Sequence, residues 1–189
     1  MSRRVSIVHR IVVGSVIAAI VAGLTRLTAR AAAAPAAWRD PVAISQPGLS
    51  AEYLVADGNA DGSAVAAWIA RTDENVRSLE VSRREFGGPW GPPERVADIG
   101  DSSARVVVAM HDDGTVALAW NDARTLWTML RPATTGAWTQ AAALSTPGAW
   151  AQRPTTTART DGTTAAAWIE AAPPTFRFCE STVAAVASG

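Results

Sequence analysis

The chain has little of several residue types on which protein function commonly depends. Its 189 residues include one cysteine, two histidines and one tyrosine, and all 17 basic side chains are arginines. The single cysteine, Cys179, cannot form an intrachain disulfide, which excludes a disulfide-stapled scaffold. Because the sequence has neither a Cys/His cluster nor a Gly-rich phosphate loop, we expect no metal and no cofactor.

The N-terminal region lacks an apolar run long enough to cross a bilayer. Its uncharged, mostly apolar run covers 14 residues, 11–24, against the roughly 20 that a membrane-spanning helix needs. Three arginines precede this run, and small residues at 31–36 follow it, which is the order found in a secretory signal peptide. We therefore expect residues 1–34 to be removed and the protein to be secreted. An uncleaved membrane anchor through residues 11–24 is the alternative, and Arg26 and Arg30 favour it.

Loss of the signal segment changes the charge of the chain. Five arginines and no acidic residue precede residue 35, so the remainder carries 12 basic and 17 acidic residues, a net charge of −5. An acidic domain has no general attraction to nucleic acid or to anionic lipid. We expect no nucleic-acid partner.

The most prominent feature of the sequence is a repeat with fixed internal spacing. Trp, 22 residues, Asp-Gly, five residues and Trp follow one another three times without a gap. The instances are Trp38/Asp61-Gly62/Trp68, Trp90/Asp113-Gly114/Trp120 and Trp138/Asp161-Gly162/Trp168. Periods of 48 to 52 residues indicate a repeat architecture, with units near 38–89, 90–137 and 138–170.

Each unit is predicted to form four short strands. In the middle unit these are Arg105–Met110, Thr115–Trp120, Leu126–Leu130 and a fourth strand from Trp138 to Ser145. Asp113-Gly114 predicts a tight hairpin, because Asp-Gly supplies the positive φ values of a type I′ turn. In the first unit, Ala51–Ala56, Ser63–Ile69 and Leu79–Ser82 correspond to the first three strands.

The second strand of each unit is small and apolar on both faces, as in Ala64–Ala67, Val116–Ala119 and Thr164–Ala167. A strand without alternation is expected to be buried on both sides. A helix is the competing interpretation, because alanine is the best helix former. The preceding Asp-Gly and the short length favour the strand.

This four-stranded unit resembles the blades of secreted bacterial β-propellers of the sialidase-like, Asp-box kind. The resemblance is in blade layout and covers Trp38 to about Glu170. The expected fold is therefore all-β, with tandem propeller-like blades over residues 35–170. Trp38–Ser45 is expected to be a fourth strand that precedes the first full unit.

The ring of blades is incomplete in this sequence. It holds two full blades and partial ones, whereas a propeller needs at least four. Residues 171–189 diverge from the repeat and are expected to be a poorly ordered tail. A truncated or frame-shifted chain is one explanation, and a homo-oligomer that closes the ring is the other.

Three residues share one repeat position. Tyr53, Arg105 and Arg153 each follow a repeat tryptophan by 15 residues, at the predicted start of the first strand. In a closed ring they would gather at one channel mouth. Sialidase-like enzymes hold a substrate carboxylate with arginines and use a tyrosine nucleophile, so the resemblance implies an anion site here. Solvated strand ends are the alternative interpretation.

Two of the eight tryptophans, Trp127 and Trp150, fall outside the repeat. The six at repeat positions are expected in the core, since periodic aromatics are most often structural. We therefore take Trp127 and Trp150 as candidate platforms for stacking a sugar ring. The functional hypothesis is an exported, non-catalytic binding or scaffold module for carbohydrate or a cell-surface protein. A truncated remnant of a sialidase-like glycoside hydrolase is the alternative.

Overall fold

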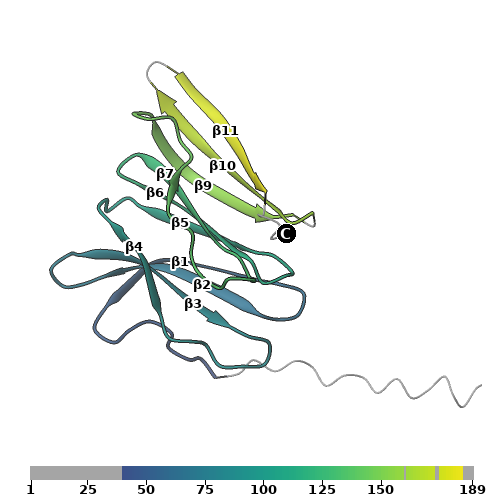
Figure 1. Cartoon of the computed structure of the whole chain (residues 1–189). Helices are drawn as coiled ribbons and strands as arrows, with labels where there is room; N and C mark the ends of the chain where they lie inside the picture. Colours follow the sequence, from purple (N-terminus) through teal and green to yellow (C-terminus); the bar gives the residue numbers. More distant parts are fainter. Residues whose placement is uncertain (1–39, 160, 173–174, 185–189) are drawn as a thin grey trace, which may run out of the picture. The chain divides into compact units, whose positions relative to one another are not determined.

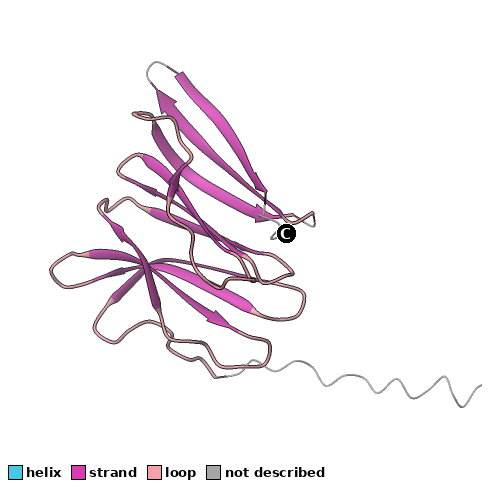
Figure 2. Ribbon diagram, in the orientation of Figure 1, coloured by secondary structure: helices cyan, strands magenta, loops and turns pink. Residues whose placement is uncertain are grey.

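The computed structural model describes residues 40–159, 161–172 and 175–184. The chain divides into two units, 1–41 and 42–189, and only residues 40 and 41 of the first unit are described. The expected signal or anchor segment, residues 1–34, lies outside the described part. All regular structure in that part is β-strand (Figure 2), and it holds no helix of a length and apolarity suited to crossing a membrane.

The strands form three antiparallel sheets in which neighbours in sequence pair (Figure 1). Sheet 1 contains β1 (Ser50–Gly58), β2 (Ala64–Arg71), β3 (Arg77–Arg84) and β4 (Glu94–Ile99). Sheet 2 contains β5 (Arg105–Met110), β6 (Val116–Asp122), β7 (Thr125–Arg131) and β8 (Ala142–Ala143). Sheet 3 contains β9 (Trp150–Ala158), β10 (Thr163–Ala172) and β11 (Thr175–Ala184). The predicted all-β class is confirmed.

The second strands are buried as the sequence predicts. Every residue from Val65 to Ala70 of β2, and from Val116 to Asn121 of β6, is buried. Small side chains allow this because neighbouring elements approach both faces of the strand. Trp68, Trp120 and Trp168, the tryptophans at the end of the repeat, are at most 5% exposed. They are core residues, as expected from their period.

The Asp-Gly hairpins differ from the prediction. In the middle turn, the His111 N–H donates to the Thr115 carbonyl at 2.9 Å, and the Gly114 N–H donates to the His111 carbonyl at 2.9 Å. Only the glycine has positive φ, 85°. The loop is therefore a three-residue turn that ends in a left-handed glycine, and the type I′ prediction is wrong. The same bonds recur at Asn59–Ser63 and Arg159–Thr163.

Aspartate chemistry explains the preference for this turn. The carboxylates of Asp61, Asp113 and Asp161 each accept a hydrogen bond from the backbone N–H two residues later, at 2.7, 2.8 and 2.9 Å. Such a side chain closes the turn without positive φ at its own position. The two-residue turn with positive φ at both positions lies elsewhere, at Ala123 and Arg124 between β6 and β7.

The fourth strands are shorter than predicted. β8 is two residues long, although the sequence predicts a strand from Trp138 to Ser145. The described residues of the expected leading strand, 40–45, form no strand, and Trp38 lies outside the described part. Residues 175–184, in the tail expected to be poorly ordered, form β11 along β10. The β-branched and aromatic content of this segment favours a strand.

Two junctions join the sheets. In the first junction, Val65, Ile69, Leu79 and Val81 of sheet 1 pack with Val106, Val116, Leu118, Trp120 and Met129 of sheet 2. In the second junction, Ala119 and Leu126 of sheet 2 pack with Ala151 and Trp168 of sheet 3. The first strands β1, β5 and β9 contact one another in that order.

Candidate functional site

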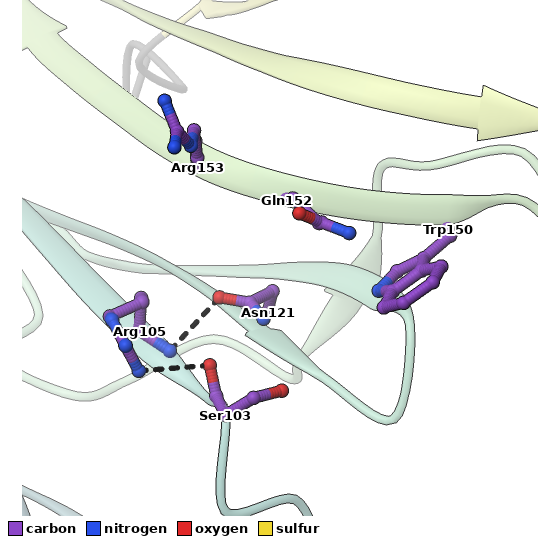
Figure 3. Close-up of a pocket in the computed structure, with 6 residues that line it drawn as sticks. All are labelled: Ser103, Arg105, Asn121, Trp150, Gln152 and Arg153. Atoms are coloured by element: carbon purple, nitrogen blue, oxygen red, sulfur yellow. Dashed lines mark hydrogen bonds between the residues drawn. The ribbon is translucent and has the colours of Figure 1, made fainter. Parts of the chain in front are cut away.

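A pocket of about 370 Å³ lies at the second junction (Figure 3). Ser103, Arg105 and Asn121 line it from sheet 2 and the turn before it, and Trp150, Gln152 and Arg153 line it from β9. Three of the five candidate residues from the sequence, Arg105, Arg153 and Trp150, therefore share one pocket. A fourth, Tyr53, contacts Arg105 from β1.

Arg105 is held in place on several sides. Its backbone N–H donates to Asn121 Oδ1 at 2.9 Å, and its Nη1 donates to the carbonyls of Ser103 and Ala104 at 3.0 and 2.9 Å. The guanidinium carbon lies 3.6 Å from the centre of the Tyr53 ring, in cation–π geometry. Arginine has five N–H donors, and both recorded side-chain bonds leave from Nη1. The guanidinium is thus held in one orientation by the backbone before β5 and by the Tyr53 ring.

Trp150 presents an accessible aromatic surface at the first position of β9. Its side chain is 46% exposed, and the guanidinium of Arg124 lies 5.2 Å from the ring centre. The Arg124 carbonyl accepts a hydrogen bond from the Ala151 N–H at 2.8 Å, which ties the β6–β7 turn to β9. The indole is therefore oriented by a neighbouring sheet while part of it remains open to solvent.

Three of the five described non-glycine residues with positive φ line this pocket or contact residues that line it. Tyr53, Arg124 and Arg153 have φ values of 56°, 76° and 51°. The pairing register shifts at Tyr53 and at Arg153, so both residues sit in β-bulges. A left-handed conformation costs a residue with a side chain about 1–2 kcal/mol. Strain of this kind is enriched at binding sites, where it aims a side chain that a regular strand would direct elsewhere.

The six lining residues include two arginines and no acidic residue. Asp101, two residues before Ser103, is engaged by Ser103, whose N–H and Oγ donate to it at 2.8 Å each. These bonds lower the pKa of Asp101, the backbone bond contributing most. The Asp122 carboxylate is likewise bonded to the N–H groups of Gly100 and Asp101. The pocket wall carries two guanidinium groups in a chain whose residues 35–189 have a net charge of −5.

Trp127 lies apart from this pocket. It is half-buried on β7, opposite Trp120 in the β6–β7 register, and packs against the apolar cluster of the first junction. Its surroundings are those of a core residue rather than of a ligand platform. Trp90 and Trp138 also pack against apolar clusters, and Trp38 lies outside the described part.

Sequence reasoning missed Ser103, Asn121, Gln152 and Arg124. A signal for Asn121 exists within the repeat, because the same position holds Ile69 in the first unit and Ile169 in the third. A polar residue in place of isoleucine at this repeat position indicates that the second junction is not packed as a purely apolar core. Ser103, Gln152 and Arg124 carry no comparable signal.

Within the described ranges, no group of three or more His, Cys, Asp or Glu side chains is placed to hold a metal ion. Comparison with protein-family models finds no match to this chain, and comparison with curated proteins finds none either.

Proposed function

We propose that this protein is an exported, non-catalytic binding module that takes an acidic carbohydrate in the pocket of the second junction. The observation that carries the proposal is the meeting of Trp150, Arg105 and Arg153 in one cavity wall. An indole face stacks on the apolar face of a sugar ring, and guanidinium groups pair with a carboxylate. Asn121 and Gln152 add amide groups that suit sugar hydroxyls.

The composition of the wall favours binding over hydrolysis. Most glycosidases use two carboxyl groups that flank the scissile bond. The residues that line this pocket are guanidinium, amide, hydroxyl and indole side chains. They suit recognition of charge and shape, with no acid and base pair among them.

A second candidate, the remnant of a sialidase-like glycoside hydrolase, is favoured by one contact. The single tyrosine of the chain, Tyr53, lies under Arg105, and Arg105 shares the pocket with Arg153. A tyrosine nucleophile beside a carboxylate-binding arginine pair is what the sialidase-like resemblance implies. Release of free sugar from an acidic glycan would favour this candidate over simple binding.

We further infer that the three sheets are propeller-like blades. Each is an antiparallel meander, and the first strands β1, β5 and β9 adjoin in order. This arrangement supports a radial array with the first strands innermost. The pocket would then open near the inner strands, where propellers commonly bind ligands.

The test compares one acidic oligosaccharide with its neutral parent by isothermal titration calorimetry on the full chain. We expect binding of the acidic sugar and binding of the neutral sugar that is weaker by about tenfold or more, the size of one charge-assisted contact. Trp150→Ala and Arg153→Gln should each weaken binding by a similar factor. Trp150 fluorescence should also change with the acidic sugar.

Two substitutions outside the pocket serve as matched controls. Arg95→Gln removes a guanidinium on β4, and Phe86→Ala removes an aromatic ring that is 77% exposed. Both should bind like the wild type. Equal affinity for the acidic and neutral sugars, or equal loss in the control variants, would contradict the proposal.

A further inference from the structure

Sheets 1 and 3 each have one face that no other sheet covers in the described part of the chain. The repeat allows a comparison with the covered faces. We call "front" the face that sheets 1 and 2 turn toward the following sheet, with Leu79 and Leu126 as members. We call "back" the face that sheets 2 and 3 turn toward the preceding sheet, with Trp120 and Trp168 as members.

The front of sheet 3 is an unfilled half of a junction. Phe178 pairs in register with Ile169, as Leu126 pairs with Asn121 and Leu79 with Ile69. Leu79 and Leu126 are 0% exposed because the next sheet covers them, whereas Phe178 is 91% exposed. An aromatic ring in this position is a large apolar surface directed at the place of a next sheet.

The back of sheet 1 is the complementary half. Leu54 precedes Val106 by the 52-residue period of the repeat. Val106 is 3% exposed within the first junction, whereas Leu54 is 62% exposed. Each face therefore exposes one large hydrophobic residue at a position that the internal junctions bury, while Trp68 on the back of sheet 1 is already covered by Ile44, Leu49 and Trp90.

We propose that the chain associates head to tail with a second copy of itself, the front of sheet 3 in one copy packing on the back of sheet 1 in the next. The two internal junctions support this occupant, because each joins a front face to a back face built from the same repeat. The contact is heterologous, so successive copies either close into a ring or extend as a filament. This inference does not depend on the ligand of the pocket.

The free edge of β11 provides a second point of contact. Among the described residues β11 pairs with β10 alone, whereas β3 and β7 also pair with a fourth strand. Ile44 packs beside Trp68 at the back of sheet 1. Val96 of β4 and Leu144 after β8, which follow Ile44 by 52 and 100 residues, pack at the equivalent places in the two junctions.

Ile44 and its neighbours thus occupy the position of a fourth strand that belongs to a preceding sheet. In the docked pair, this segment of the second copy would lie along the edge of β11 in the first copy. Covering an unpaired edge satisfies its N–H and C=O groups and removes a site of non-specific pairing. The same segment would then complete sheet 3 and cover part of its front face.

The test introduces one charged residue into one of the two faces at a time. In sedimentation velocity on the full chain, we expect the wild type to form species heavier than a monomer as concentration rises. Leu54→Asp and Phe178→Asp should each raise the dissociation constant by roughly 30-fold or more, the size of an interface hot spot. Because each variant keeps one intact face, an equimolar mixture of the two should form a dimer and stop there.

Val76→Asp is the matched control, because Val76 is 53% exposed in the β2–β3 turn and belongs to neither face. It should associate like the wild type. Leu54→Ser and Phe178→Ser provide milder changes, and near-ultraviolet circular dichroism checks that each variant is folded. A monomeric wild type, association that survives both Asp variants, or loss with Phe178→Asp alone would overturn the proposal, since these outcomes assign the faces to another occupant or to a symmetric contact.

Discussion

The two junctions are built from the same repeat but differ in what fills them. The first junction is lined by valine, isoleucine, leucine, methionine and tryptophan side chains. The second holds a smaller apolar cluster beside the polar pocket. Ile69 is 1% exposed in the first junction, and the residue at the same repeat position in sheet 2, Asn121, lines the pocket.

In this repeat protein, the first junction provides mainly apolar packing, and the second combines a smaller apolar cluster with a polar pocket. A single exchange of isoleucine for asparagine converts a core position into a pocket wall and a bonding partner for Arg105. Two buried polar residues, His111 and Glu170, make contacts of this kind in the second junction. His111 Nε2 lies 2.7 Å from Thr164 Oγ1, and Glu170 Oε2 accepts from the N–H of Thr146 and from Trp168 Nε1. Polar pairing there takes over part of the role that apolar packing has in the first junction.

The largest expected effect comes from removing one buried leucine at each junction. Leu118 and Leu126 are both 0% exposed, and they belong to the first and the second cluster respectively. Each Leu→Ala change should cost about 2–5 kcal/mol in the free energy of unfolding. Leu118→Ala should lie nearer the upper limit, because its larger apolar surroundings leave a drier cavity.

Urea denaturation of both variants beside the wild type measures the difference. Equal losses, or a larger loss for Leu126→Ala, would remove the energetic distinction between the junctions. Thr157→Ala, at an exposed position of β9, is the control and should leave stability within about 0.5 kcal/mol.

For Asn121→Ile we expect a smaller change in the free energy of unfolding and a complete loss of binding of the acidic sugar. The change restores the residue found at the same repeat position in sheet 1. It gains apolar burial and loses the hydrogen bond from the Arg105 N–H, so stability should change by no more than about 1–2 kcal/mol. Binding of the acidic sugar should disappear, because the pocket wall becomes bulky and apolar and Arg105 loses its positioning partner.

The reciprocal change, Ile69→Asn, is the matched control for that variant. It removes an apolar side chain that is 1% exposed and buries an amide in the first junction, so it should cost at least as much as the Leu→Ala changes, about 2–5 kcal/mol, while leaving the sugar affinity of the folded protein unchanged. Calorimetric titration and urea denaturation of the two variants together separate the pocket from the core. Retained binding in Asn121→Ile would show that the pocket wall is not where the ligand lies.

The sequence predicted the elements that depend on local pattern. The strand Arg105–Met110 has the predicted bounds, and the burial of β2 and β6 follows from their small, unalternating side chains. Spacing also identified the buried tryptophans. These features could be predicted because burial periodicity and β propensity act within a few residues.

Features that depend on contacts between sheets could not be predicted in the same way. Trp127 and Trp150 both lie outside the repeat positions, yet Trp127 packs in a core and Trp150 lines a pocket. The difference depends on the side chains that the neighbouring sheet presents to each tryptophan. The short β8 and the strand status of residues 175–184 depend likewise on pairing partners. The bulge at Tyr53 has no local sequence signal such as glycine or proline, whereas Pro154 marks the bulge at Arg153.

The smallest expected effect on stability concerns the Asp-Gly turns, which recur in every unit of the repeat. Hydrogen bonds from Ser63 lower the pKa of Asp61, the backbone N–H contributing most, and hydrogen bonds from Thr163 lower that of Asp161, the hydroxyl contributing most. A carboxyl whose pKa is lower in the folded state than in the unfolded state stabilises the fold above its unfolded pKa. This stabilisation is lost as the pH falls from the ordinary value of 3.8 through the folded pKa.

Asp61→Asn and Asp161→Asn should therefore lower the urea midpoint at neutral pH and make its decline in acid shallower. Thr163→Ala removes the hydroxyl that donates to Asp161 at 2.6 Å, whereas Ser63→Ala leaves intact the 2.7 Å backbone bond to Asp61. Of these two, Thr163→Ala should flatten the acid decline more. Urea midpoints followed from about pH 6 to about pH 2 provide the comparison. An unchanged acid decline in both Asn variants would mean that the aspartates fix the turn geometry without any net charge-dependent stabilisation.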